Sequence, residues 1–427
     1  MQPKRSLTLD EIDLSAIDLW TRPYDEREGA FLTLREEDPI RFFEEPELES
    51  ELLPRGPGYY ALTRHADVLE ASKQPQLFCS GRGTNIGDMP EDFLEFLGSM
   101  INMDDPKHAR LRRIVSRGFT PRQLDQMKGD VEATAAGIVD DIIERGEGDF
   151  VTDIAATLPL RIIVDMMGIP RSQEKFIFEC TNVILGLGDP EYVPDQTEAG
   201  IMTALLTAAR DLSLLITELG EARVKEPRDD VTTALVTAEV DGESLTPAEL
   251  ASFFILLVVA GNETTRNAIS HGLLALTEHP EEKARWAADF DALAPSAVEE
   301  IVRWATPVIH FRRTVTQDGA RIGDRTFDAG DKVVLWYCSA NRDAAVFDDP
   351  FRFDVGRTPN DHLGFGGPGP HFCLGAHLAR REITVMFDEL FRRVPDIRAV
   401  GEPERLQSNF INGIKHLRAE WTPAAAR

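Results

Sequence analysis

The residue best placed to do chemistry is Cys373, which lies in the stretch His362–Arg381 between a glycine-rich turn and a predicted helix. Gly366 and Gly369 allow backbone conformations that a side chain would forbid, and Gly375 lets a flat ligand approach the chain closely. The thiol is expected at a helix start, where free amide groups and the helix dipole favour an anion. Such a place favours a thiolate, the form of cysteine that binds metals or attacks substrates.

The other cysteines decide which metal chemistry Cys373 could support. Cys79, Cys180 and Cys338 are scattered along the chain and form no CxxC pair. Zinc and iron–sulfur sites need several clustered ligands, so this spacing argues against both. A haem needs only one protein thiolate, because the porphyrin supplies four ligands. On residue chemistry alone, a buried structural cysteine is an equally good interpretation of Cys373.

A long helix is predicted from residue 246 onward. Thr246–Glu249 combines an N-cap residue, a proline at the first helical position and an acid three residues after the cap. The apolar pattern continues to about Glu278, which makes a helix of about 32 residues and roughly 48 Å. Its first half, including Phe253–Ala260, is apolar on all sides, which implies burial.

Polar residues interrupt this helix at Gly261–Asn267, where burying them needs a reason. In one interpretation Thr264 bonds the carbonyl four residues earlier and Glu263 pairs with Arg266. In the other, Ala260 and the following glycine leave space for a groove, with the acid and the alcohol beside it. The residues alone leave both interpretations open.

Two further pairs of residues have helical spacing. His108 and Arg112 are four apart after a helix start at Asp105–Pro106, so they share one face and could bind an anion. Glu300 and Arg303 are three apart and could pair. The alternatives are a solvated basic helix and a surface ion pair that contributes only about 0 to 1 kcal/mol.

Apolar residues in irregular segments are candidates for the lining of a pocket. They occur in the broken stretch Cys79–Asn102, in the extended run Val308–Phe311 and in the turn Asn409–Lys415. Ordinary packing against the core is an equally good explanation for the first of these segments. The candidate pocket residues are Met89, Phe93, Met100, Val308, Phe410 and Ile411.

The composition limits the classes of protein to consider. The chain of 427 residues has 46 basic and 73 acidic residues and a net charge of -27, so it should repel nucleic acid and anionic membranes. Its longest apolar run, Phe253–Gly261, is far shorter than the roughly 20 residues of a membrane span. The N-terminus has no apolar signal core, and unpatterned cysteines suggest reduced thiols and a cytoplasmic location.

The glycine-rich loop resembles a known family signature. Gly369, His371, Cys373 and Gly375 look like the haem-ligand motif of the cytochromes P450. Where that family usually has phenylalanine, seven residues before the cysteine, this chain has Gly366, with a phenylalanine one residue earlier; Pro368 is a further departure. The resemblance runs from about residue 20 to 420, and its five motifs occur in the expected order.

This resemblance implies a fold and a reaction. We expect a triangular prism of the cytochrome P450 type, mainly α with small β-sheets, as one catalytic domain over residues 1–427. Residues 1–25 would form an N-terminal arm and residues 421–427 a frayed tail. The two helices Ile177–Leu187 and Gly200–Leu219 would form a mobile lid over the substrate. The expected reaction is a monooxygenase cycle with haem b and O2.

The resemblance also assigns roles to individual residues. Cys373 would be the axial ligand of the haem iron, Thr264 would orient bound dioxygen and Glu263 would relay protons. Glu300 and Arg303 would form a buried structural pair. The residues implied to bind the cofactor are His108, Arg112, Ala260, Arg313, Gly369, His371, Cys373 and Gly375.

Partners and substrate follow from the same resemblance. Electrons would pass from NAD(P)H through ferredoxin reductase and an acidic ferredoxin. Several stretches resemble bacterial hydroxylases of methyl-branched lipids, which implies ω-hydroxylation of a branched lipid, isoprenoid or sterol side chain. Hydroxylation of terpenoids, fatty acids or macrocycles, a peroxide-driven reaction and a non-enzymatic haem sensor are the alternatives. The basic patch expected to receive the ferredoxin comprises Arg110, Arg113, Arg117, Arg380 and Arg381.

Overall fold

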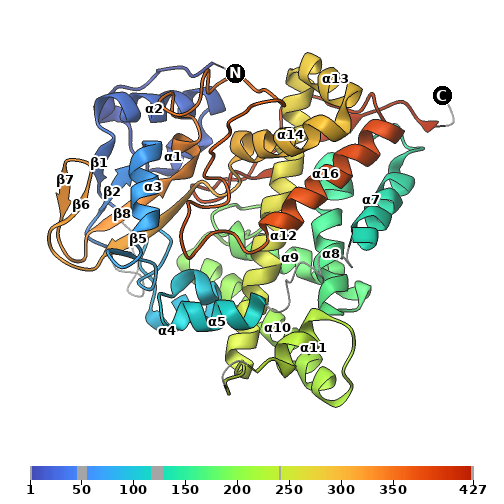
Figure 1. The fold of residues 1–427 in the computed structure, drawn as a ribbon, viewed down its shortest axis with the longest axis horizontal. Coiled ribbons are helices and arrows are strands. Elements are labelled where there is room, and N and C mark those ends of the chain that lie inside the picture. The colour runs from blue at the N-terminus through green and yellow to red at the C-terminus, as the bar shows by residue number, and fades with distance from the viewer. Residues whose placement is uncertain (1, 46–54, 117–127, 240–241, 425–427) are drawn as a thin grey trace.

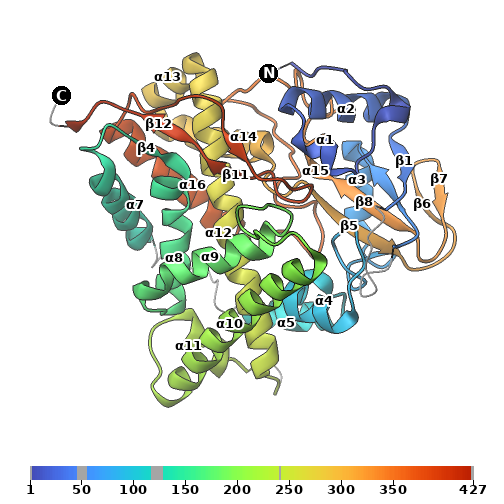
Figure 2. The same cartoon turned by 180° about the vertical axis from the view of Figure 1, so that it is seen from behind.

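The computed structural model describes residues 2–45, 55–116, 128–239 and 242–424. This part of the chain is mainly helical, with the largest sheet on one side of the molecule (Figures 1 and 2), so the predicted fold class is confirmed. The helices are α1 (Ile17–Thr21), α2 (Tyr24–Glu37), α3 (His65–Lys73), α4 (Glu91–Gly98), α5 (Lys107–Val115), α7 (Lys128–Ile142), α8 (Thr157–Met167), α9 (Glu174–Leu185), α10 (Glu198–Lys225), α11 (Val231–Thr237), α12 (Pro247–Glu278), α13 (Pro280–Ala288), α14 (Phe290–Ala305), α15 (Tyr337–Ala340) and α16 (Ala376–Arg393).

Twelve short strands complete the described part of the fold. Five of them form the largest sheet, in the order β1-β2-β8-β5-β3. Strands β2 and β8 are parallel, and the other pairs in this sheet are antiparallel. The strands are β1 (Ile40–Phe43), β2 (Tyr59–Leu62), β3 (Phe78–Cys79), β4 (Glu147–Asp149), β5 (His310–Val315), β6 (Ala320–Ile322), β7 (Arg325–Phe327), β8 (Lys332–Trp336), β9 (Arg398–Ala399), β10 (Glu404–Arg405), β11 (Ile414–His416) and β12 (Arg418–Glu420).

Helix α12 passes through the middle of the molecule (Figure 1), and its predicted boundaries are confirmed. At its start the Thr246 hydroxyl accepts a hydrogen bond from the Glu249 backbone at 3.2 Å, and the Glu249 carboxylate accepts one from the Thr246 backbone at 2.8 Å. This reciprocal capping satisfies amide groups that a helix start leaves without partners. The position of the helix start is therefore determined by neighbouring residues and does not depend on contacts with the rest of the protein.

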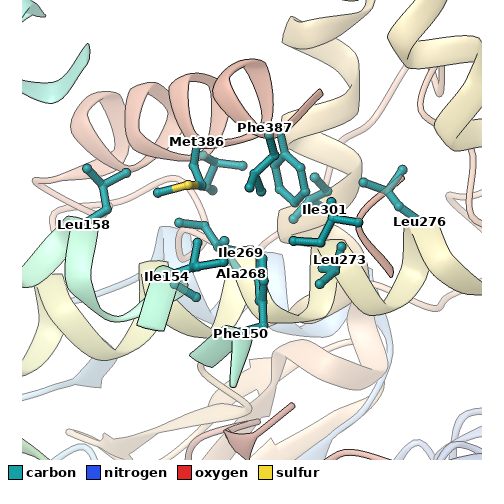
Figure 3. Packing of buried hydrophobic residues seen from close by; sticks show 14 of the residues in the cluster. Phe150, Ile154, Leu158, Ala268, Ile269, Leu273, Leu276, Ile301, Met386 and Phe387 are labelled. Carbon is teal, nitrogen blue, oxygen red and sulfur yellow. The ribbon is translucent and has the colours of Figure 1, made fainter. Parts of the chain in front are cut away.

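The second half of α12 lies at the centre of a large apolar core. Figure 3 shows its side chains facing α16 on one side and the α8 region on the other. Burial of this much apolar surface is the main source of stability in such a core, at roughly 25 cal/mol per Å². The labelled residues are Phe150, Ile154, Leu158, Ala268, Ile269, Leu273, Leu276, Ile301, Met386 and Phe387.

A buried ion pair joins α14 to the segment that leads toward Cys373. Arg303 makes two hydrogen bonds of 2.7 Å to Glu300, and both side chains are fully buried. Arg303 also donates to the carbonyls of Asn341 and Pro350, both at 2.9 Å. The Arg357 guanidinium makes a further contact of 3.1 Å with Glu300. The pair therefore joins α14 to the stretch 341–357, which comes later in the sequence.

Two expectations need correction. The C-terminal tail is not frayed from residue 421, because Trp421 is 5% exposed and packs in the core, while residues 425–427 lie outside the described part. The broken stretch before residue 102 contains helix α4, which the sequence pattern did not predict.

By length and composition, α10 and α12 could each cross a membrane, although a buried core helix passes the same test. Both pack against neighbouring helices, α12 most completely.

Candidate functional site

Cys373 lies in the loop before α16 and faces an internal cavity. Its backbone N–H donates to the Phe365 carbonyl at 3.0 Å, and the Gly375 backbone N–H is bonded to its thiol. The first helical residue is Ala376. Cys373 therefore lies between the glycine-rich turn and the helix, as predicted, and just before the N-cap residue Gly375. The thiol is accessible because it borders the cavity, while the surrounding protein raises its pKa by desolvation.

The glycines of this loop bring it close to α3. Gly366 and Gly369 have φ values of 82° and 154°, which favour glycine. A Cβ atom on Gly369 would lie 2.5 Å from the Ser72 carbonyl oxygen, so the loop could not pack this closely with any other residue. Phe365, one position before the usual place of the phenylalanine, lines the cavity and packs under Arg380, whose guanidinium carbon is 4.4 Å from the ring centroid.

The cavity lies between the cysteine loop, α12, α16 and β5. Ala260 and Thr264 of α12 border it, whereas a Cβ on Gly261 would lie 2.8 Å from Ile163 of α8. The small residue at 261 therefore allows α8 to approach α12 closely. Apolar side chains form much of the remaining wall, among them Ile163, Met166, Phe253, Leu256, Val308 and Phe311.

One wall of the cavity gathers cationic and imidazole groups from three separate segments. Arg112, Arg313 and His371 line it, and the ring of His108 lies 4.4 Å from that of His371. Burial, helped by the positive charges of Arg313 and Arg112, lowers the pKa of His371 to about 3. Burial also lowers the pKa of His108. Both rings lie beside two guanidinium groups, and guanidinium groups bind carboxylates through paired hydrogen bonds.

These residues fit a haem. The His108 Nε2 atom is buried and has no hydrogen-bond partner among the described residues, so it is available to a carboxylate of the porphyrin. Cys373 offers a thiolate ligand on the same cavity, and a Cβ atom on Gly375 would meet nothing within 4 Å, which leaves room for a flat ring. A single thiolate with porphyrin donors is a complete ligand set for haem iron.

The acid and alcohol of α12 point in different directions. The Thr264 hydroxyl faces the cavity and donates to the Ala260 carbonyl at 2.6 Å. Glu263 is 1% exposed, does not line the cavity, and pairs with Arg266, while Asn267 donates to the same carboxylate at 3.0 Å. Thr264 therefore fits both interpretations of the sequence, because it bonds the carbonyl four residues earlier and also borders an open space. Glu263 follows only the structural one, because consecutive helical positions face different sides.

The candidate pocket residues divide into two groups. Met100 and Val308 line the cavity. Ile411 pairs with Val308 through a β-bridge, and the Phe410 ring lies 5.6 Å behind that of Phe311, so both support the wall without forming it. Met89 and Phe93 are also absent from the lining. These four do not line the cavity as it stands, and their part in a substrate pocket stays a prediction.

Some lining residues were not predicted from the sequence. Tyr337, Thr265 and Glu382 all border the cavity. Glu382 is 2% exposed, and burial raises its pKa to about 8. The helical repeat of α16 contained the signal, because Leu378 and Glu382 are four apart and lie on one face.

The expected basic patch is largely neutralised by nearby acids. Arg110 pairs with Glu243 and Glu249, Arg380 pairs with Glu299, and Arg381 pairs with Glu132. Arg113 is exposed on α5, and Arg117 lies outside the described residues. The patch is thus a mixed surface of paired charges, with less positive potential than the sequence suggested.

Comparisons with known proteins agree with this site. Residues 207–394 match the model of the family described as Cytochrome P450. The chain is 51% identical over 423 residues to a methyl-branched lipid omega-hydroxylase of Mycobacterium bovis, covering 98% of this chain and 97% of the relative. A steroid C26-monooxygenase of Mycolicibacterium smegmatis is 37% identical, with 92% of this chain and 90% of the relative covered.

The solved structures give the same result. A cytochrome P450 of Mycobacterium marinum in complex with pseudoionone has a TM-score of 0.90 and 41% sequence identity to this chain. The match covers 98% of this chain and 100% of that one. With the cysteine loop, the cavity and the long helix in place, this chain belongs to the cytochrome P450 family.

Proposed function

We propose that this monooxygenase hydroxylates the terminal methyl group of a methyl-branched lipid, isoprenoid or sterol side chain. The observation that carries the proposal is the apolar wall of α8, α12 and β5 residues on the cavity that Cys373 also lines. A wall of this kind holds an aliphatic chain by shape and desolvation. The names of the two curated relatives support the same class of substrate.

Each group around the cavity has a definite task in this function. Bound haem b supplies the iron at which dioxygen is reduced by two electrons, and Cys373 would be its protein ligand. His108, Arg112, Arg313 and His371 would hold the carboxylates of the porphyrin. The Thr264 hydroxyl lies on the cavity, where it would position a hydrogen-bonded oxygen or water.

Substrate class is tested by optical titration of the ferric protein with a matched panel. Methyl-branched fatty acids, a sterol and straight-chain acids of equal carbon number would be compared. The dissociation constants read from the Soret shift should be at least about tenfold lower for branched compounds than for straight ones, a difference in binding free energy of roughly 1.4 kcal/mol. The products should carry the hydroxyl on the terminal methyl. Equal affinity for both classes, or hydroxylation within the chain, would contradict the proposal.

We also propose that electrons come from NAD(P)H through a reductase and an acidic ferredoxin in the cytoplasm. All four cysteines are free thiols, which suits a reducing compartment. The α5 face beside the cysteine loop carries the exposed Arg113, and Arg112 donates to the Phe372 carbonyl of the loop at 2.6 Å. A ferredoxin docked there would therefore lie close to the haem ligand.

The docking proposal predicts a charge-dependent rate of reduction. Arg113→Glu should slow reduction by ferredoxin by about tenfold at low salt, because opposite charges accelerate encounter. The matched control is Arg321→Glu, an exposed arginine of β6, which lies far from α5 in Figure 1 and should leave the rate unchanged. Stopped-flow absorbance at several salt concentrations measures both. A rate that responds neither to salt nor to Arg113→Glu would remove the proposal.

A further inference from the structure

Three arginines from separate segments gather beside Tyr24 of α2, and none of them lines the cavity. The guanidinium carbons of Arg27 and Arg405 each lie 4.9 Å from the centroid of the Tyr24 ring. Arg342, which follows α15, is close enough for its positive charge to act on Tyr24 as well. The group therefore brings together α2, strand β10 and the stretch after α15, which are remote from one another in the sequence.

These guanidinium groups lack partners that buried charges normally have. Arg27 is 6% exposed, and its Nε and Nη2 atoms have no hydrogen-bond partner among the described residues. The same holds for Nη1 of Arg405 and Nε of Arg342. Arg342 donates from its other nitrogens to the carbonyls of Arg303 and Trp304, at 3.4 and 3.0 Å. Because an unpartnered buried charge is costly, the free donors of Arg27 and Arg405 call for a ligand.

The groups around these arginines do not balance their charge. Burial, together with the positive charges of the three arginines, lowers the pKa of His271 on α12 to about 3, so this imidazole is neutral. Glu28 is buried next to Arg27, but it forms no ion pair within the described part of the chain, and its Oε2 atom has no partner. The acids that act on Arg405 are exposed to solvent; they are Glu278 and Glu402. Buried positive charge therefore exceeds buried negative charge at this place.

We propose that the free guanidinium donors of Arg27 and Arg405 bind a small inorganic oxyanion of the phosphate class beside Tyr24. A guanidinium group presents paired N–H donors that match the oxygens of an oxyanion, and the anion also offsets the excess positive charge. Arg405 and Tyr24 are only partly buried, so an ion from solvent can reach the site. The bound anion would hold α2 against β10, a role that does not depend on the substrate of the enzyme.

Calorimetric titration of the haem-loaded protein with inorganic phosphate tests the site directly. One phosphate should bind per chain, and general attraction would not explain it because the net charge of the chain is -27. Arg405→Gln should weaken this binding by at least about tenfold, since it removes the charged donors. The matched control is Arg418→Gln, an exposed arginine of β12 that pairs with Glu147 and should leave the affinity unchanged. Absence of binding to the wild type, equal affinity in Arg405→Gln, or equal affinity for chloride would overturn the proposal.

Thermal unfolding of the same haem-loaded variants provides a second measurement. A ligand that binds only the folded protein raises the unfolding temperature, so phosphate should raise it above the value in chloride at equal ionic strength. Phosphate also stabilises proteins in general by exclusion from their surface, and the variants separate the two effects. The specific part of the increase should be lost in Arg405→Gln and in Arg27→Gln, and kept in Arg418→Gln. The same increase in all variants would mean that only water occupies the site, and it would refute the proposal while leaving the monooxygenase function standing.

Discussion

Cys373→Ser is expected to abolish the red-shifted Soret band of the reduced, carbon-monoxide-treated protein and to lower product formation by about 10⁴-fold, the scale on which loss of one central catalytic group acts. Serine is nearly isosteric, so the loop hydrogen bond from residue 373 to Phe365 and the cavity wall remain. What disappears is the thiolate that donates electron density to the iron.

The matched control for this prediction is Cys180→Ser. Cys180 lies on α9, is 8% exposed and does not line the cavity, so its replacement should leave the Soret band and the activity as they are. Absorbance spectra and product analysis measure both variants. A Cys373→Ser protein that still shows the red-shifted band would mean that another group binds the iron, and the assignment of the site would be wrong.

Local sequence signals predicted α12 well because its start is determined by neighbouring residues. Thr246 and Glu249 cap each other across three positions, and apolar residues then fill both halves of the helix on either side of Gly261–Asn267. The loop around Cys373 was predictable for the same reason, since Gly366 and Gly369 need conformations that few other residues adopt. Signals of this kind do not depend on the rest of the fold.

The direction of Glu263 was not predictable from the same signals. Helix α12 is buried on most sides, so the pattern of apolar residues does not show which side faces the cavity. That side is decided by contacts with distant segments, such as Asn182 on α9 and the close approach of Ile163 to Gly261. Local spacing determines which residues share a helical face, but only the packing of several helices determines where that face points.

The same reason explains the missed and misplaced pocket residues. Phe410 and Ile411 come from the predicted segment, but they contact Phe311 and Val308, and it is these two that line the cavity. Glu382 was missed although it follows Cys373 by a few helical turns, because an acid on an amphipathic helix usually faces solvent. Glu382 is buried instead, and it is hydrogen-bonded to Thr265, a residue far away in the sequence.

Arg303→Met is expected to destabilise the protein by about 3 to 5 kcal/mol, the cost of leaving one member of a buried ion pair without its partner. Burial lowers the pKa of Arg303 to about 10, so it is charged at neutral pH and balances Glu300. Its loss also leaves the carbonyls of Asn341 and Pro350 without their donor. Methionine fills much of the same volume, so the effect reports charge and hydrogen bonding more than a cavity.

An exposed pair provides the control for this prediction. Arg418 lies 2.9 Å from Glu147, and both side chains are more than half exposed, so Arg418→Met should change stability by only about 0 to 1 kcal/mol. Denaturant unfolding at constant haem content measures the two variants side by side. Glu300 pairs with both Arg303 and Arg357. Since Glu300 and Arg303 interact directly, the double variant Glu300→Gln with Arg303→Met should lose less stability than the sum of the two single variants. If Arg303→Met shifted the unfolding midpoint no further than Arg418→Met, the pair would contribute nothing to holding α14 against the segment that carries the haem ligand.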